Sequence, residues 1–418
     1  MKQDDLIFRN IGKLISFPGI GPVPGTKMDS PEVIENAAVS VCEGIISVFG
    51  PENDVWEKAN IAEDAGCIDC KGRCVVPGFV DPHTHAVFGG TREFELPMKL
   101  RGASYLDILE AGGGILRTVQ DTRALSVEEL TDQLDGRLDK MVRYGTTTVE
   151  IKSGYGLDRD TEIRLLEAVK ASKHPMEKVS TFLGPHAIPP EFKNEPEKFL
   201  DMMIGMLPEI AERNLAEYAD IFCEKGVFTS EQSRKFLIAA REAGLKVKIH
   251  SDEIENLGGT LVGAELKAAS ADHLLVSNEV DLKAMKESGT VPVMLPGTLM
   301  TIFENRVPRV RNMIDMDLPL AIATDINPNC LVENMQYIQS LACYRLRMTP
   351  NEVLAASTAN SAHAIGLSHR KGRIAPGFDA DILILKDESF EHVVYNFGVN
   401  HVDSVFIKGK RILSDIGW

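Results

Sequence analysis

The sequence predicts an α/β protein: a TIM-type (β/α)8 barrel together with a small β-sandwich domain formed by both chain termini. Short apolar segments alternate with amphipathic helical patterns from residue 75 onward, and eight such segments would close a barrel. Both ends of the chain instead alternate every two residues and are broken by glycine turns, which is typical of antiparallel strands. We therefore expect the sandwich in residues 1–74 and 367–418, and the barrel in residues 75–366.

The expected barrel strands are short apolar segments. They cover residues 75–81, 146–152, 178–183, 219–223, 246–250, 271–275, 291–295 and 320–324. The helical patterns between them carry end signals. "SVEELTDQLDGRLDKMVRYG" opens on Ser126 as N-cap with Glu129 three residues later, and it stops at Gly145. A second pattern, "TSEQSRKFLIAAREAG", covers residues 229–244. We expect both helices in the outer ring of the barrel.

Four terminal segments show the alternation of antiparallel strands, two before the barrel and two after it. They read "LIFRNIGKLISF", "AAVSVCEGIISVFG", "GRIAPGFDADILIL" and "VDSVFIKGKRIL". Neither terminal piece could bury one of its faces alone. We therefore expect the two pieces to pair into one domain, with the barrel inserted between them.

Composition limits the classes of partner. The chain has 418 residues and a net charge of −16, which disfavours nucleic acid and means that an anionic substrate needs a local cation. No apolar run approaches the roughly 20 residues that cross a bilayer, so we expect no membrane partner. The opening "MKQDDLIFRN" lacks signal-peptide features, and the seven scattered cysteines suit a reducing compartment. These observations favour a cytoplasmic protein.

Histidines and one aspartate follow the ends of predicted strands. In "VVPGFVDPHTHAVFGG", His83 and His85 project from the same face because alternate side chains of a strand share a face. His186 follows the third expected strand, and the fifth, sixth and eighth strands end at His250, His273 and Asp325. All these positions lie at the C-terminal mouth of a barrel, where active sites of this fold are found.

Three imidazole nitrogens and one carboxylate oxygen suit a divalent metal ion such as Zn²⁺ or Fe²⁺, with room for one water. Such an ion lowers the pKa of a bound water towards roughly 7. The pattern of strand-end residues therefore indicates a metal-dependent hydrolase.

Several motifs resemble a known family. "PGFVDPHTH", "LKVKIH", "SADHLL" and "AIATDINP" together resemble the amidohydrolase superfamily. The resemblance narrows to its imidazolonepropionases, which act in histidine degradation, and the segments that narrow it are "FGGTREFE", "GGGILRTVQDTRA", "TTTVEIKSGYGL", "TFLGPHAIPPEF", "IHSDEIENLGG" and "MLPGT". It implies hydrolytic opening of the ring of 4-imidazolone-5-propanoate to N-formimidoyl-L-glutamate.

The resemblance also implies roles for single residues. The metal ligands would be His83, His85, His250 and Asp325. Catalysis would use Glu253 to hydrogen-bond the ring and move a proton, His273 to orient or deprotonate the water, and Asp325 as well. The residues expected to contact the substrate are Arg92, Tyr105, Tyr155, His186, Glu253, Asn327 and Asn329. Arg92 suits a carboxylate because its planar guanidinium can grip both oxygens.

Two positions depart from patterns of the superfamily. Binuclear members carry a carbamylated lysine at the end of the fourth strand, where this chain has Cys223 and Glu224, so we expect one metal ion per chain. After Asp325 the family usually reads Asn-Pro-Gly followed by Ser or Thr, whereas residues 327–330 read Asn-Pro-Asn-Cys. This change bears on how the amino-acid end of the substrate or product is held.

Other interpretations stay open at this point. Glu253 could be a surface carboxylate at a helix start, and Tyr155 could be a loop aromatic packed on the barrel rim. A deaminase acting on a purine-like ring is the nearest functional rival, and a scaffold without catalytic activity is a rival from another class. The expected partner is a small anionic molecule, and the sequence leaves a homodimer open.

Overall fold

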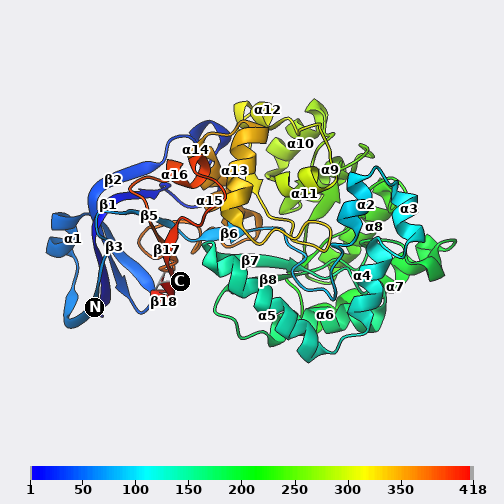
Figure 1. Cartoon of the computed structure of the whole chain (residues 1–418), viewed down its shortest axis with the longest axis horizontal. Coiled ribbons are helices and arrows are strands. Elements are labelled where there is room, and N and C mark those ends of the chain that lie inside the picture. The colour runs from blue at the N-terminus through cyan, green and yellow to red at the C-terminus, as the bar shows by residue number, and fades with distance from the viewer. Residues whose placement is uncertain (1, 415–418) are drawn as a thin grey trace.

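The computed structural model describes residues 2–414, apart from the side chains of 105, 106 and 414. Figure 1 shows a strand-rich part that holds both ends of the chain, beside a larger part in which helices surround parallel strands. This arrangement confirms the predicted α/β class, with a barrel and a separate strand-rich unit built from both termini. Among the described residues, no helix is long and apolar enough to cross a membrane.

The terminal strands form one eight-stranded sheet, in the order β18-β17-β16-β5-β1-β2-β3, with β4 also paired to β1. Its core contains Phe8, Val39, Ile382 and Phe406, so each terminus covers the other's apolar side chains. The strands are β1 (Asp4–Ser16), β2 (Glu32–Cys42), β3 (Ile45–Pro51), β4 (Ile61–Asp69), β5 (Cys74–Pro77), β16 (Ile382–Leu385), β17 (Val402–Ile407) and β18 (Lys410–Ser414).

The long strand β1 lies inside the terminal sheet and pairs with three other strands. It pairs along one edge with β2, and along the other edge first with β4 and then with β5. A register shift between Phe8 and Ile11 bends it part-way, as β-bulges do. Strand β4 was not among the segments predicted from the sequence.

The barrel strands form two five-stranded parallel sheets, ordered β6-β7-β8-β9-β11 and β10-β12-β13-β14-β15. The expected fourth and fifth strands are each interrupted, and their halves belong to different sheets. The strands are β6 (Phe79–Asp81), β7 (Thr146–Lys152), β8 (Glu177–Phe182), β9 (Tyr218–Ala219), β10 (Phe222–Cys223), β11 (Lys246–Val247), β12 (Ile249–Ser251), β13 (Ser270–His273), β14 (Val291–Met294) and β15 (Ala321–Ile322).

The prediction of one barrel strand over residues 75–81 is wrong. Its first half is β5, which pairs with β1 and β16 in the terminal sheet, and only β6 belongs to the barrel. The chain changes sheet at Gly78, where a Cβ atom would lie 2.2 Å from Thr147 Oγ1. Only glycine permits this close approach. Where the two units divide along the chain stays a prediction.

Backbone contacts beyond β6 and β15 close the barrel. The N–H of Asp325 donates to the carbonyl oxygen of His83 at 3.1 Å, and the N–H of His85 donates to that of Ile326 at 2.9 Å. The strand-end residues of the first and last barrel strands therefore lie side by side. Closure brings residues more than 240 positions apart into one site.

The helices begin and end largely where the sequence indicates. Ser126 and Glu129 form the predicted capping box of α5, and Thr229 forms one with Gln232 at α8. The barrel helices are α2 (Glu95–Leu100), α3 (Tyr105–Glu110), α4 (Ile115–Arg123), α5 (Val127–Arg143), α6 (Arg159–Ala171), α7 (Pro196–Glu212), α8 (Ser230–Glu242), α9 (Gly259–Glu265), α10 (Glu279–Ser288), α11 (Pro296–Thr301), α12 (Val310–Asp315), α13 (Met335–Leu346), α14 (Pro350–Ala356) and α15 (Ala359–Ala364).

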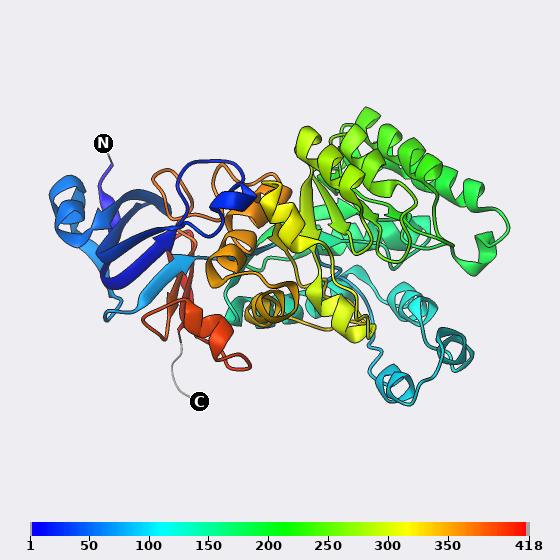
Figure 2. The same ribbon diagram turned by 90° about the horizontal axis from the view of Figure 1, so that it is seen from above.

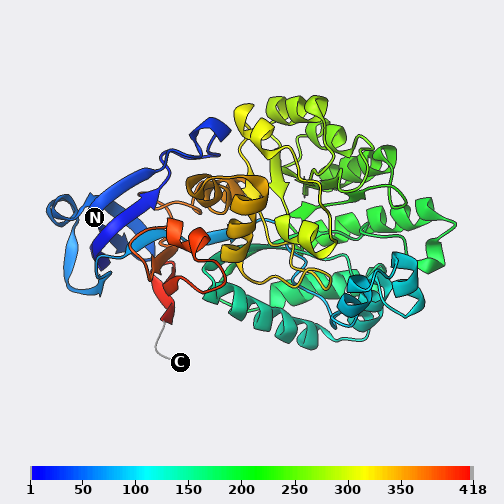
Figure 3. The ribbon, with the colours of Figure 1, turned by 45° about the horizontal axis from the view of Figure 1, so that its top comes forward.

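Two further short helices are α1 (Glu52–Lys58), which packs on β2 and β3, and α16 (Glu391–Tyr395), which packs on α13. Figures 2 and 3 show α2 and α3, in cyan, on the side of the barrel away from the terminal sheet. These two helices come from the long connection between the first two barrel strands. That connection carries Arg92, one of the predicted substrate contacts.

Candidate metal centre and active site

Five predicted residues meet at the barrel mouth. Ligand atoms of His83, His85 and Asp325 lie within 4.8 Å of one another, and so do those of His83, His250 and His273. His83 belongs to both groups. The Nε2 atoms of His83 and His85 lie 3.4 and 3.5 Å from Asp325 Oδ1. The four predicted metal ligands therefore share one cluster, and His273 adjoins it.

The buried polar atoms of the cluster are suited to bind a metal ion. His83 Nε2, His250 Nε2 and Asp325 Oδ1 are buried, and no hydrogen-bond partner among the described residues satisfies them. Burial also lowers the pKa of His83 and of His85 well below the usual range, which favours the neutral imidazoles that bind metals. Buried polar atoms without a partner are costly, so a cation here would satisfy all three at once.

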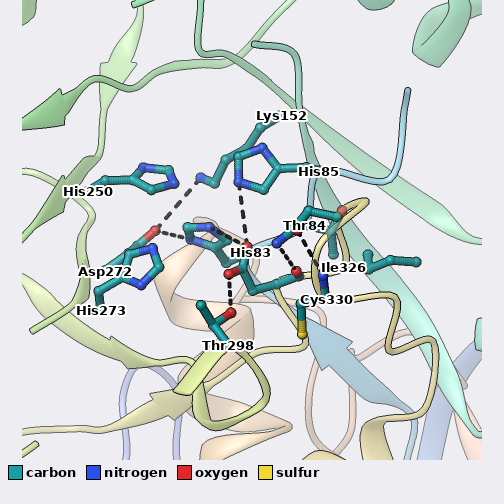
Figure 4. A network of polar contacts seen from close by, with 12 residues as sticks. His83, Thr84, His85, Lys152, His250, Asp272, His273, Thr298, Ile326 and Cys330 are labelled. Carbon is teal, nitrogen blue, oxygen red and sulfur yellow. Dashed lines mark hydrogen bonds and ion pairs between the residues drawn. The ribbon is translucent and has the colours of Figure 1, made fainter. Parts of the chain in front are cut away.

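Two of the histidine rings have a carboxylate next to their Nδ1 atom. His83 Nδ1 lies 2.6 Å from Asp272 Oδ2, and His250 Nδ1 lies 3.0 Å from Asp220 Oδ2. The hydrogen bond of His83 Nδ1 and the ion-pair contact of His250 Nδ1 with these carboxylates leave both Nε2 atoms free to bind, the arrangement usual for metal-binding histidines. Figure 4 shows His83 between Asp272 and the centre of the cluster. The sequence analysis did not include Asp220 or Asp272 among the site residues.

Glu253 and His273 lie next to each other at the edge of the histidine cluster. Burial raises the pKa of Glu253 to about 7, and its Oε2 lies 3.7 Å from His273 Nε2. Burial lowers the pKa of His273 to about 3. His273 has a φ of +81°, an unusual value for a residue other than glycine and one often found at functional sites. Because Glu253 is largely buried, the interpretation as a surface carboxylate is wrong.

Glu224 supports the loop that carries Glu253. Its carboxylate accepts the backbone N–H groups of Ile254 at 2.8 Å and Glu255 at 3.1 Å. It follows β10, the second part of the interrupted fourth barrel strand. The side chain at this position therefore shapes the loop after β12.

His186 and Tyr155 cover one side of the metal cluster. The ring of His186 stacks on that of His85, with centroids 4.8 Å apart and an interplanar angle of 16°. Tyr155 is buried, with its ring centroid 5.6 Å from that of His85. It therefore faces the cluster, and the alternative of a rim aromatic does not hold. Glu162, missed in the sequence analysis, anchors this loop by accepting three backbone N–H groups from residues 154–157.

Arg92 lies at the mouth but is already paired. Its Nε and Nη2 donate to the two carboxylate oxygens of Glu95 at 2.7 and 2.9 Å. Lys99 Nζ lies 3.5 Å from the same carboxylate, so two cations share one anion. Arg92, Lys99 and Asn329 line a cavity of about 610 Å³. Lys99 was missed in the sequence analysis, although it lies four residues after Glu95 on one helix, a spacing that places both on one face.

In the segment after Asp325, the side chain of Asn327 forms hydrogen bonds within the segment. Asn327 donates through Nδ2 to the carbonyl oxygen of Asp325 at 2.7 Å, and its Oδ1 accepts the N–H groups of Asn329 and Cys330. Asn329 instead accepts a hydrogen bond from Lys99. Asn327 thus shapes the loop, and Asn329 reaches the mouth cavity. The side chain of Tyr105, another predicted contact, lies outside the described residues.

Comparison with known proteins agrees with this geometry. Residues 74–412 match the amidohydrolase family. The chain belongs to this family. An imidazolonepropionase of Bacillus velezensis is 47% identical over 100% of this chain and 99% of its own, and one of Alkaliphilus metalliredigens is 44% identical over 98% of each chain.

The solved structures show the same fold. The crystal structure of an adenosine deaminase from Xanthomonas campestris with bound zinc has a TM-score of 0.72 and 17% identity, and the match covers 99% of this chain and 94% of the other. This chain therefore shares its fold with that structure, over the barrel and the terminal sheet alike. The family is metal-dependent, and the histidine cluster supplies ligands for a metal ion.

Proposed function

We propose that this amidohydrolase hydrolyses 4-imidazolone-5-propanoate to N-formimidoyl-L-glutamate, a step of histidine degradation. The observation that carries the proposal is the similarity over the whole chain to relatives named imidazolonepropionase, at 44–47% identity. The site supports it with a buried histidine cluster and a cation-lined cavity at the same barrel mouth. We further propose one divalent ion per chain, Zn²⁺ or Fe²⁺, and activity in the cytoplasm.

The metal centre would be built by His83, His85, His250 and Asp325. When bound, the ion would activate a water as nucleophile and polarise the ring carbonyl. His273, 3.7 Å from Glu253, would orient the attacking water, and Asp272 and Asp220, next to the Nδ1 atoms of His83 and His250, would keep the ligand nitrogens in position. The rings of Tyr155 and His186 would enclose the flat substrate and exclude other water.

Glu253 would carry the proton. Hydrolysis joins the oxygen of water to the ring carbonyl carbon, breaks the bond from that carbon to its ring nitrogen, and requires a proton on the departing nitrogen. A carboxyl group with a pKa raised to about 7 can take a proton from the water and pass it to that nitrogen at neutral pH. This relay matches the position of Glu253 beside His273.

The propionate group would bind where the cations gather. Arg92 and Lys99 carry two positive charges, and Glu95 neutralises one of them, which leaves one for an anionic ligand. On a chain of net charge −16, such a local cation is needed to attract an anion. Asn329 holds Lys99 at the edge of the cavity.

The test is to incubate metal-loaded protein with imidazolonepropionate and to follow the ring absorbance, the formimidoyl product and free ammonia. Loss of the ring with formation of N-formimidoylglutamate and without ammonia supports the proposal. Release of ammonia would identify a deaminase. An intact ring under these conditions would overturn the assignment of substrate.

A further inference from the structure

A group of buried charges lies in the barrel interior around the metal cluster. Two lysines and three carboxylates contribute to it from the second, fourth, fifth and sixth strand positions of the barrel, and each side chain is fully buried. They are Glu150, Lys152, Asp220, Lys248 and Asp272. None of them has a role in the steps above, except that Asp220 and Asp272 face histidines.

Lys152 connects the three carboxylates. Its Nζ lies 2.8 Å from Glu150 Oε1, 2.8 Å from Asp220 Oδ2 and 3.7 Å from Asp272 Oδ2. The two oxygens that it approaches on Asp220 and Asp272 are the same ones that face His250 Nδ1 and His83 Nδ1. Figure 4 shows Lys152, Asp272 and His83 joined in one chain of contacts.

We propose that Lys152 is a positioning residue for the metal centre, which acts through Asp220 and Asp272 to hold His250 and His83 with their Nε2 atoms directed at the metal. The inference rests on the histidine cluster as a metal centre and goes beyond the proposed substrate. Lys152 itself touches neither metal ligand atoms nor substrate.

The physical reason is the cost of buried like charges. Asp220 and Asp272 are both fully buried, and the Lys152 ammonium lies 2.8 Å from one and 3.7 Å from the other, so it offsets the repulsion between two buried like charges. Burial by itself would lower the pKa of Lys152, yet the carboxylates raise it above the usual range and keep the ammonium charged. Without this ammonium, the carboxylate oxygens that face His250 Nδ1 and His83 Nδ1 would lose the contact that they share, and with it a constraint on their position.

Lys248 provides a matched control. It is equally buried, but its Nζ donates to the carbonyl oxygen of Pro82 at 2.7 Å and lies 3.7 Å from Glu150. Among the described residues it forms no ion pair with Asp220 or Asp272. Removing either lysine therefore deletes one buried charge, but only Lys152 links the two carboxylates that hold histidines.

The experiment measures the dissociation constant for Zn²⁺ of Lys152→Met and Lys248→Met by competition with a chelator, with no substrate present. We expect Lys152→Met to bind zinc about 10- to 100-fold more weakly, as when outer partners of ligands are removed, and Lys248→Met to stay within about threefold of the parent. The absorption spectrum of the Co²⁺-loaded protein should change in Lys152→Met only.

The direction of the change in zinc affinity distinguishes a loss of histidine orientation from the mere loss of a positive charge. Removing a positive charge near a cation site would by itself tighten metal binding. Unchanged or tighter binding in a folded Lys152→Met protein would therefore overturn the proposal. So would an equal loss in Lys248→Met, because that would assign the effect to general destabilisation. Circular dichroism of the metal-free variants checks the fold.

If Lys152→Met does not fold, a second variant and a double-mutant cycle test the proposal. Lys152→Gln keeps a hydrogen-bond donor but no charge, and it should also weaken zinc binding. Its effect should be smaller in a chain that carries Asp272→Asn than in the parent, because both changes interrupt the same link. Additive effects would contradict the link. Because zinc binding is measured without substrate, the outcome is independent of the ring-opening assay.

Discussion

Glu253 is a buried carboxyl group whose pKa, raised by burial to about 7, lets it exchange a proton near neutral pH. It lies beside His273 but is not among the residues whose ligand atoms cluster around His83. Its effect on the rate should therefore be separable from metal binding. Single residues of this kind decide the chemistry.

Glu253→Gln should keep the metal and lose most of the activity. The amide preserves the shape of the side chain but cannot carry the proton, and loss of one general acid–base group costs roughly 10²–10⁴-fold in rate. Metal content by elemental analysis and kcat on imidazolonepropionate are the measurements. A rate within a few-fold of the parent would show that another group moves the proton.

Lys99→Met should weaken capture of the propionate. A lost charge-assisted hydrogen bond is worth about 1.5–3 kcal/mol, or roughly 10- to 100-fold in kcat/KM, and the loss should appear mainly in KM. An imidazolone without the propionate should react equally slowly with parent and variant. Lys283→Met removes the same charge from the exposed face of α10 and should leave KM unchanged. Equal damage to both substrates would assign Lys99 to loop structure.

At the scale of elements, the loop between β7 and α6 places Tyr155 against the cluster. Glu162 at the start of α6 accepts backbone N–H groups from Gly154, Gly156 and Leu157, so the helix and the loop form one unit. Gly154 has a φ of +109°, and a Cβ there would lie 2.9 Å from the carbonyl oxygen of Leu183 and 3.0 Å from His186 Nδ1. The loop thus depends on a glycine.

Gly154→Ala should destabilise the protein and displace His186 from its ring stacking on His85. The strained backbone costs about 1–3 kcal/mol, and activity should fall together with stability. Urea unfolding and steady-state kinetics test this. Gly136→Ala is the matched control: it lies inside α5 with open space around its Cβ position, so it should stabilise by about 0.5–1 kcal/mol. Unchanged stability and activity of Gly154→Ala would show that the loop can accommodate the added methyl group.

At the scale of the whole molecule, ion pairs join the barrel to the terminal sheet. Arg370 grips both oxygens of Glu177, the first residue of β8, at 2.8 and 3.2 Å, and it also bonds Asp379 at 2.7 Å. Lys408 Nζ lies 3.5 Å from the same glutamate. These contacts join a barrel strand to residues near the C-terminus.

The Glu177 carboxyl group should make the free energy of unfolding depend on pH in the acid range. Burial by itself would raise its pKa, but Arg370 outweighs this and lowers the value to about 2. A lowered native pKa contributes stability that is complete above the unfolded value of about 4.3 and is lost as pH falls towards 2. The contribution at neutral pH is on the order of 1–2 kcal/mol, reduced from the full linkage value because the pair is partly open to water.

Glu177→Gln should therefore unfold more easily at pH 7, and its free energy of unfolding should converge with that of the parent near pH 2. Urea unfolding between pH 2 and 7 measures the two curves. Glu287→Gln, an exposed change on α10, should follow the parent throughout. Parallel curves for Glu177→Gln and the parent would remove this pair from the acid response.

Local patterns determined much of this protein from the sequence by itself. The strand at residues 146–152 and the capping box of Ser126 and Glu129 occur as predicted, because strand alternation and helix caps depend on neighbouring residues. The histidines and Asp325 at strand ends cluster because parallel strands of a barrel all end at one mouth. The clustering of these side chains at the barrel mouth could thus be predicted from the sequence.

Only the tertiary structure decided which partners surround these residues. The strand expected over 75–81 divides at Gly78 because β5 is needed between β1 and β16, a pairing across more than 300 residues. Lys152 meets Asp220 and Asp272 for a related reason. Ionised groups buried in a barrel must find opposite charges, and barrel closure brings these from other strands, where periodicity along the chain carries no information.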